Sequence, residues 1–296
     1  MKIAVTGKSG QVVTALLERG AVVGHDVIAL GRPELDLADP RTVLRALQAA
    51  APDVVVSAAA YTAVDKAESE ADLALAINGA GADAVATAAK VLGVPLIHIS
   101  TDYVFDGARD RPYLESDPTG PTGAYGASKL AGEQAVQKVY SEGSAVLRVA
   151  WVYSPFGANF VKTMLRLAAD RDEVSVVADQ IGNPTSALDI ADGILMVAAN
   201  LAESDDPALR GIFHMTAHGE ASWAEFADAI FAASAGHGGP YASVKPITTA
   251  DYPTPATRPA NSRLDCSLIE TTHGVTLPDW RSALETVVSR LQADPD

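Results

Sequence analysis

A tyrosine and a lysine four residues apart are the side chains of this sequence with the clearest chemical potential. Tyr125 and Lys129 enclose the segment Tyr-Gly-Ala-Ser-Lys, and this spacing places both on one face of a helix. A nearby ammonium and the positive end of a helix favour the phenolate, so we expect the pKa of Tyr125 to lie below its usual value of about 10. Such a tyrosine can exchange a proton with a carbonyl or alcohol oxygen. The same pair is common by chance, so its position in the fold must show whether Tyr125 and Lys129 are catalytic.

Two hydroxyl residues end an apolar segment that we expect to form a strand. This segment is Pro95–Ser100, and Ser100 and Thr101 stand at its end. Ligands of open parallel sheets bind at the carboxyl ends of strands, so a hydroxyl here can hold a substrate oxygen beside Tyr125. The alternative is a hydroxyl that only supports a turn. His98 lies inside the segment, where we expect a core histidine, and the six histidines lack the spacing of metal ligands.

A glycine loop follows the first expected strand, Lys2–Thr6. Gly7 and Gly10 precede a segment of helical pattern, Gln11–Arg19. A tight turn at a helix N-terminus offers backbone N–H groups and the positive end of the helix dipole to a pyrophosphate. The position directly after the first strand favours this function over glycines kept for steric reasons alone. Val13 stands where a third glycine is usual, so we expect the helix to lie slightly farther from the strand.

The end of the second expected strand, Asp26–Leu30, indicates which dinucleotide binds. Gly31 and Arg32 follow it, with no acid at the strand end. An acid there would bind the ribose 2′-hydroxyl, whereas an arginine accepts a 2′-phosphate. We therefore favour NADPH, and the alternative is an arginine that is only solvated surface. Asp36 lies four residues further on, close enough for the adenine or its ribose, so NADH remains a second cofactor to test.

The order of the elements indicates a doubly wound α/β fold of the Rossmann type. Short segments rich in Val and Ile alternate with longer segments rich in Ala and Leu. Strands that are apolar on both faces are typical of a parallel sheet covered by helices, joined by right-handed crossovers. Further expected strands are Asp53–Ala58 and Ala145–Val149, and further expected helices are Pro40–Ala50, Asp72–Leu92 and Ala124–Tyr140.

The later part of the chain predicts a second, smaller α/β domain for the substrate. Its expected segments are the helix Asn159–Arg171, the strand Glu173–Val177, a flexible loop at Ala235–Pro240 and the helix Arg281–Gln292. The helix Asp189–Leu201 and the strand Gly211–Thr216 return to the earlier pattern. We therefore assign residues 1–151 and 186–216 to a dinucleotide-binding domain, and residues 152–185 and 217–296 to a substrate domain.

Composition limits the function classes. The chain has 296 residues, of which 48% are hydrophobic, and this excludes disorder for most of it. A net charge of −15 repels phosphate backbones and anionic membranes, so we expect neither nucleic acid nor a membrane as a partner. The sequence shows no apolar run of membrane-spanning length and no signal peptide, and its single cysteine, Cys266, cannot form an internal disulfide. We expect a cytoplasmic protein.

Longer strings of the sequence resemble one family. Together with the glycine loop, Thr101 and the Tyr125/Lys129 pair, they resemble the extended short-chain dehydrogenase/reductases and, among these, the dTDP-4-dehydrorhamnose reductases. The likeness extends over essentially the whole chain. The strings are residues 58–68, 100–107, 151–153, 159–165, 179–185, 258–262 and 278–281.

The resemblance implies reduction of the C4 carbonyl of dTDP-4-dehydro-L-rhamnose by NAD(P)H, with dTDP-L-rhamnose as the product. It implies that Tyr125 protonates the nascent alkoxide, Lys129 holds the nicotinamide ribose and Thr101 binds the sugar oxygen. The cofactor residues that it implies are Gly10, Gln11 and Val12, with Asp36 and Leu37 at the adenine and Ala58, Ala59 and Ala60 along the ribose. The implied sugar-binding residues are Tyr103, Val104, Trp151 and Asn159, with Lys162 at the diphosphate. Trp151 as an ordinary core aromatic is the alternative for that residue.

Assembly and two other functions stay open. Some family members dimerise through magnesium bridged by glutamates, one of them on the first helix, where this chain has residues 14–16, Thr-Ala-Leu. We therefore expect no magnesium bridge and leave a monomer or a homodimer open. A nucleotide-sugar dehydratase or epimerase is one alternative, although dehydratases carry Asp-Glu after the threonine and this chain has Asp102-Tyr103. The other is an NADP-binding regulatory subunit, like the β-subunit of methionine adenosyltransferase.

Overall fold

A six-stranded parallel sheet organises the larger part of the molecule, which a computed structural model describes for residues 1–293. The strands lie in the order β10-β5-β4-β3-β1-β2, and every neighbouring pair is parallel. The chain begins at β1, adds β2 on one side and then crosses to β3 on the other. The predicted doubly wound α/β fold is therefore confirmed. The strands are β1 (Lys2–Thr6), β2 (Asp26–Leu30), β3 (Val54–Ser57), β4 (Leu96–Thr101), β5 (Ser144–Val149) and β10 (Gly211–His214).

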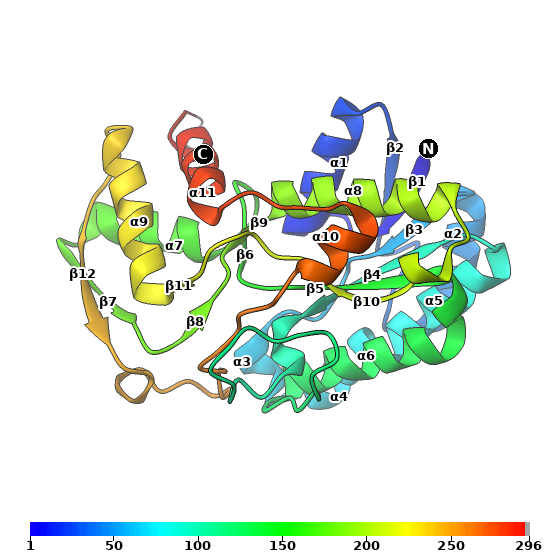
Figure 1. The fold of residues 1–296 in the computed structure, drawn as a ribbon, viewed down its shortest axis with the longest axis horizontal. Helices are drawn as coiled ribbons and strands as arrows, with labels where there is room; N and C mark the ends of the chain where they lie inside the picture. Colours follow the sequence, from blue (N-terminus) through cyan, green and yellow to red (C-terminus); the bar gives the residue numbers. More distant parts are fainter. Residues whose placement is uncertain (294–296) are drawn as a thin grey trace.

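Helices cover both faces of this sheet because its strands are apolar on both sides. Along β1, Ile3 and Val5 face the helices α1 and α8, whereas Ala4 between them faces α2 and α5. The alternation arises because successive side chains of a strand point to opposite faces of the sheet. Figure 1 shows α1 and α8 along one face and α5 and α6 along the other. The helices are α1 (Gln11–Val22), α2 (Val43–Ala50), α5 (Gly81–Leu92), α6 (Ala124–Tyr140) and α8 (Ala187–Glu203).

The segment predicted as one helix, Asp72–Leu92, contains a wider turn. Helix α4 (Ala71–Leu75) passes through a π turn at Ala76–Ala80 into α5. Asn78 lies buried in this turn, and its amide bonds both the N–H and the C=O of Tyr61, at 2.8 and 3.0 Å. It also donates to the Ser128 hydroxyl at 2.9 Å. A buried amide with all of these partners satisfied explains why the helix widens here, a feature that apolar periodicity does not encode.

A second hydrophobic core lies under the later elements, at the left of Figure 1. Helices α7, α9 and α11 enclose it together with the parallel pair β7·β12. Tyr153, Phe226 and Trp280 are fully buried members of this core. These elements are α7 (Phe160–Asp170), β7 (Glu173–Val177), α9 (Trp223–Gly236), β12 (Ser243–Ile247) and α11 (Trp280–Ala293). Helix α9 takes in the first residues of the loop that we expected at Ala235–Pro240.

Short elements connect the two cores. Three buried residues beyond position 217, Ile269, Val275 and Leu277, pack into the core of the large sheet, although the predicted boundary placed them with the substrate domain. The predicted division therefore remains a prediction, and residues 294–296 of its last segment lie outside the described residues. The short elements are α3 (Val64–Ala67), β6 (Val152–Tyr153), β8 (Ile181–Gly182), β9 (Thr185–Ser186), β11 (Ala221–Ser222) and α10 (Ser267–His273).

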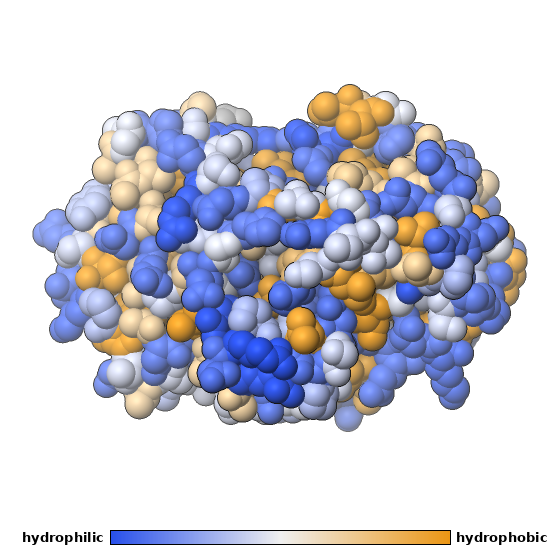
Figure 2. All heavy atoms as spheres, in the orientation of Figure 1, coloured by the Kyte–Doolittle hydropathy of each residue, from blue (hydrophilic) through white to orange (hydrophobic). Residues whose placement is uncertain are grey.

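The face of the molecule drawn in Figure 2 is mostly hydrophilic. Figure 2 shows separate hydrophobic groups, one of them over the end of α1, where Val22 and Val23 are 70% and 54% exposed. None of the helices within residues 1–293 is both long and apolar enough to cross a membrane. In the same residues, no group of three or more His, Cys, Asp or Glu side chains is arranged to hold a metal ion.

Candidate active site

The glycine loop leaves the start of α1 open to an anion. Gly7 has φ +105° and its N–H donates to the Leu30 carbonyl at 2.6 Å, which draws the loop across the end of β2. Gly10 is the N-cap of α1, and no side chain within residues 1–293 caps this helix end. The free N–H groups and the helix dipole are therefore available for a phosphate. The loop therefore has the donors that the pyrophosphate of a dinucleotide requires.

The residues after the glycine loop pack against it and also connect it to a later segment of the chain. Val13 is buried and faces Gly7, whose added Cβ would lie 3.2 Å from a Val13 methyl. Val12 beside it is half-buried. The side-chain amide oxygen of Gln11 accepts from the Ser154 hydroxyl at 2.8 Å. Gln11 thus joins the loop to the segment that leads into the smaller core, a link that the family resemblance did not indicate.

The loop after β3 is fixed to the end of β1. The Thr6 hydroxyl accepts from the backbone N–H groups of Ala58 and Ala59, both at 3.0 Å. Ala60 follows, and all three alanines are half-buried at the carboxyl edge of the sheet. The strand order reverses between β1 and β3, and this is where open α/β sheets bind nucleotides.

Two cations flank the point where the ribose 2′-substituent was predicted to bind. Arg32 is exposed just beyond β2. The Lys8 ammonium lies beside it, donates to the Arg32 carbonyl at 3.0 Å and pairs with Glu34 at 2.7 Å. Our sequence reasoning missed Lys8, although its place inside the glycine loop was a signal. Asp36 accepts from the Ala38 N–H at 3.0 Å and so shapes its own turn.

Leu37 is the other residue predicted at the adenine, and it is buried. It packs against Gly81 at the start of α5, where an added Cβ would lie 2.8 Å from the Leu37 Cβ. The contact requires glycine, and it holds the loop after β2 against the helix layer.

Strand β4 and helix α6 bring the three predicted catalytic residues together. Thr101 ends β4, and Tyr125 lies in the first turn of α6, where the Thr101 side chain is near enough to the phenol to act on its pKa. One turn later, the Lys129 ammonium donates to the Ile99 carbonyl of the same strand at 2.6 Å. Thr101 and Lys129 are 5% and 4% exposed, so their polar groups are held out of bulk water. All three residues thus lie by the carboxyl end of β4, with the ammonium bound to the backbone of that strand.

The two hydroxyls at the end of β4 face opposite sides. Thr101 faces Tyr125, whereas the Ser100 hydroxyl donates to Glu133, which Arg148 binds with two hydrogen bonds of 2.9 and 2.7 Å. Neighbouring strand residues point in opposite directions, so only one of the two can face the phenol. Ser100 therefore does not supply the substrate-facing hydroxyl. His98 is buried as predicted, bonded to Ser57 at 3.1 Å.

The predicted lowering of the pKa of Tyr125 is wrong for this structure. Burial of the phenol, together with the nearby Asp102 carboxylate, raises the pKa of Tyr125 well above its usual value. Burial also lowers the pKa of Lys129 to about 8, although Glu133 acts in the opposite direction. The phenol is consequently protonated at neutral pH. A protonated phenol is the form that donates to an oxygen which gains electrons.

A second group of polar residues surrounds the phenol. The rings of Tyr103 and Tyr125 meet edge to face at 5.6 Å. Arg258 lies near the Tyr103 hydroxyl and acts to lower its pKa, against the effect of burial, and it pairs with Asp65 at 2.8 Å. Asp102 is buried, and burial raises its pKa to about 6. Arg258 was noted in the sequence only as part of a family string, because nothing in its spacing connects it with residues so far back in the chain.

The residues predicted at the sugar differ in exposure. Trp151 is half-buried, and Val104 has no accessible surface, so a substrate could contact Val104 only if its neighbours moved. Asn159 caps α7 through the Lys162 N–H at 3.2 Å and donates to the Ser154 carbonyl at 2.8 Å. Its amide therefore holds the loop in place. Lys162, the cation predicted at the diphosphate, is half-buried in the first turn of α7.

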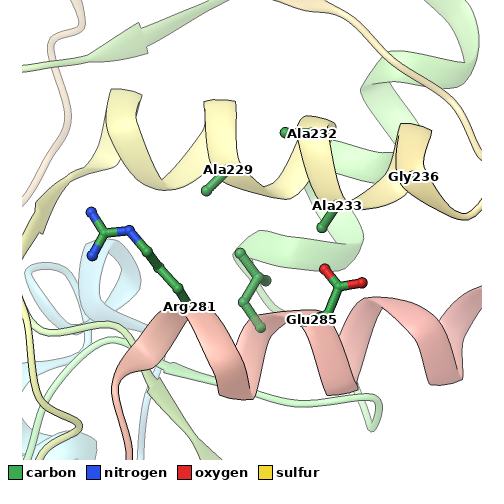
Figure 3. Close-up of a pocket in the computed structure, with 7 residues that line it drawn as sticks. Ala229, Ala232, Ala233, Gly236, Arg281 and Glu285 are labelled. Carbon is green, nitrogen blue, oxygen red and sulfur yellow. The ribbon is translucent and has the colours of Figure 1, made fainter.

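One hollow of the surface lies away from the predicted site residues. Between α9 and α11, small side chains leave a cavity of about 340 Å³, with Arg281 and Glu285 at its edge (Figure 3). None of the predicted site residues lines it. The candidate site is therefore defined by the convergence of side chains at the carboxyl edge of the large sheet.

This fold and this convergence define a class: a Rossmann-type oxidoreductase with a tyrosine, lysine and threonine site, related to enzymes of nucleotide sugars. The model of the RmlD substrate binding domain family matches residues 1–293. A dTDP-4-dehydrorhamnose reductase of Sinorhizobium fredii is 51% identical over 97% of both chains, and one of Escherichia coli is 40% identical over 98% of both. The chain belongs to this family.

Solved structures agree with this membership. The crystal structure of a dTDP-4-dehydrorhamnose reductase from Clostridium acetobutylicum has a TM-score of 0.91 and 37% identity, covering 99% of this chain and all of that one. The enzyme of Bacillus anthracis, in complex with NADP, has a TM-score of 0.88 and 36% identity, covering 97% and 98%. More distant nucleotide-sugar enzymes, such as a dTDP-glucose 4,6-dehydratase at 20% identity, share the fold.

Proposed function

We propose that this protein reduces the C4 keto group of dTDP-4-dehydro-L-rhamnose, with NADPH as the preferred reductant, and releases dTDP-L-rhamnose. The observation that carries the proposal is the phenol of Tyr125, beside Thr101 and one helix turn from Lys129, at the edge where the glycine loop also opens. The Sinorhizobium fredii and Escherichia coli relatives, named dTDP-4-dehydrorhamnose reductases, support the same substrate.

Each residue of the site has a separate role in the proposed carbonyl reduction. Bound NADPH supplies the hydride that the carbonyl carbon accepts. Tyr125 gives its phenolic proton to the carbonyl oxygen, which becomes the alcohol, and the high pKa of Tyr125 keeps that proton in place until then. Thr101 holds the same oxygen by a hydrogen bond. The Lys129 ammonium stabilises the phenolate that remains, and it is the group predicted to bind the nicotinamide ribose.

Several residues are assigned to the ligands as part of this proposal. Gly7 and Gly10 would bind the pyrophosphate, with Arg32 and Lys8 at the 2′-phosphate and Lys162 at the sugar diphosphate. The cytoplasm, with its reducing conditions, suits the unpaired Cys266. A monomer or a homodimer both remain compatible with these assignments.

One assay separates the proposed reductase from the alternatives. Enzymatically generated dTDP-4-dehydro-L-rhamnose is mixed with NADPH and the protein, and absorbance of the reduced cofactor is followed. A reductase oxidises one NADPH for each sugar consumed, whereas an epimerase or dehydratase converts the sugar without net oxidation. A regulatory subunit would bind NADPH and oxidise none. Stoichiometric oxidation with formation of dTDP-L-rhamnose is the expected result, and its absence would refute the proposal.

A further inference from the structure

The backbone of Trp151 adopts a conformation that tryptophan rarely takes. Its φ of +45° lies in the left-handed region, and Ala51 is the other non-glycine residue with positive φ among the described residues 1–293. Such a conformation persists only where the surroundings impose it, and it is enriched at functional sites. Trp151 comes directly after the end of β5 and Ala150, close to the candidate site. The structure must therefore contain the contacts that hold it.

Two contacts fix the indole of Trp151 from opposite elements. On Gly182, an added Cβ would lie only 2.5 Å from the indole Cε2, so the ring rests directly on the backbone of β8. The ring of Trp223 stacks on Trp151 with the centroids 3.6 Å apart and the planes 7° from parallel. Trp151 also accepts a hydrogen bond from the Thr185 N–H at 3.2 Å. The flat stack on Trp223 determines the tilt of the ring.

Trp223 is itself held firmly at the beginning of α9. The preceding residue, Ser222, forms a reciprocal capping box with Glu225, which fixes the first turn of the helix. The short strand β11 pairs with β8, so the support under Trp223 and the backbone under Trp151 belong to one small sheet. Phe160, the residue after Asn159, packs against Trp223 with a centroid distance of 4.6 Å.

The stack also joins the two parts of the molecule. Trp151 packs against the small core that contains Val104 and Tyr113, next to the large sheet, and Trp223 packs against the core of α7, α9 and α11. The main element contacts of α9 are with α7, α11, β7, β11 and β12. The orientation of Trp151 is thus set from the smaller core.

We propose that Trp223 is a positioning residue of the active site: by stacking on Trp151 it holds that indole in its strained orientation as a wall of the sugar pocket. The proposal rests on the proposed function, because it takes Trp151 as a residue that contacts the sugar. Trp223 does not touch the reacting atoms. Its effect is on the placement of the keto sugar, and the cofactor loop lies outside its reach.

The test replaces Trp223 by leucine and compares it with Phe231→Leu. Phe231 is fully buried in the same core and on the same helix, and its ring contact is with Tyr241, so this control removes packing without touching the stack. Circular dichroism follows the exciton signal of the stacked indoles, and steady-state assays give kcat and KM for the keto sugar. NADPH titration gives the Kd and the number of folded sites.

The expected result is specific to the sugar. Trp223→Leu loses the exciton signal and lowers kcat/KM for the keto sugar by about 10- to 100-fold, a range typical of a misplaced substrate. Its Kd for NADPH and its site number stay those of the wild type, and Trp223→Phe, which can still stack, recovers most of the activity. Phe231→Leu keeps both the signal and kcat/KM.

Two results would overturn the inference, and they differ from failure of the proposed function. If Trp223→Leu keeps the kcat/KM of Phe231→Leu, or if NADPH binding weakens as much as kcat/KM falls, Trp223 does not position Trp151 for the sugar. If the wild type oxidises no NADPH with the keto sugar, the proposed function fails and the inference with it. Should Trp223→Leu not fold, Gly182→Ala displaces the indole while leaving Trp223 in place, and the same two outcomes decide.

Discussion

Removal of the Glu133 carboxylate should destabilise the protein strongly, although this residue is not among those assigned to the cofactor or the sugar. Glu133 and Arg148 form a bidentate pair with side chains that are both 2% exposed, and Ser100 donates to the same carboxylate. Glu133→Ala leaves the guanidinium buried without its counter-charge, which costs about 3–5 kcal/mol. At about 2 °C per kcal/mol for a chain of this size, the melting temperature should fall by roughly 6–10 °C in differential scanning calorimetry.

The matched control is a pair with the same geometry at the surface. Arg19 binds Asp192 with hydrogen bonds of 2.7 and 2.8 Å, but the side chains are 36% and 40% exposed. Asp192→Ala should therefore cost less than about 1 kcal/mol, because water replaces the lost partner. Equal shifts for the two variants would refute the reasoning from burial. The double replacement Glu133→Leu with Arg148→Met should regain much of the loss, since it leaves no charge unpaired.

Three further predictions concern the reaction. Tyr125→Phe should lower kcat by about 10²- to 10⁴-fold, the range for a lost proton donor, while the Kd for NADPH stays unchanged in fluorescence titration. Arg32→Ala and Lys8→Ala should each weaken NADPH by about 10-fold or more, from the loss of a charge-assisted contact, and leave NADH nearly unaffected. The charge of Lys129 is present below a pKa of about 8 and lost above it, so kcat/KM for NADPH should fall as the pH rises through this value.

Each of these has an outcome that would contradict it. Full turnover by Tyr125→Phe would remove the phenol from the mechanism. Equal losses for NADPH and NADH in the Arg32 and Lys8 variants would show that neither cation contacts the 2′-phosphate, and Arg41→Ala, an exposed cation paired with Asp39 further along the same loop, is the matched control. A pH profile that stays flat up to the ordinary range of lysine would mean that the charge of Lys129 is not required.

The fold could be predicted from the sequence because its signals are local. Runs such as Lys2–Thr6 and Asp26–Leu30 are apolar on both faces, and the structure has these strands with the same bounds. The helix that carries Tyr125 and Lys129 was predicted as Ala124–Tyr140, which is also the observed α6. Periodicity and turn residues are sufficient at this level.

What the sequence did not reveal depends on contacts between distant residues. The stack of Trp151 on Trp223 and the pair of Glu133 with Arg148 join residues that share no periodic pattern. The raised pKa of Tyr125 follows from burial, which a spacing of four residues does not report. The opposite directions of Ser100 and Thr101 could have been predicted from the alternation along a strand, had it been applied to the last two residues of β4.

Asn78 in the π turn connects two segments of the candidate site. Its amide binds the backbone of Tyr61, directly after the cofactor-side alanines, and the Ser128 hydroxyl, directly before Lys129. Because one side chain serves both segments, the spacing between the loop that would carry the ribose and the helix that carries the proton donor is set by a group that never ionises. The link between these two segments therefore does not depend on the protonation state of an ionisable side chain.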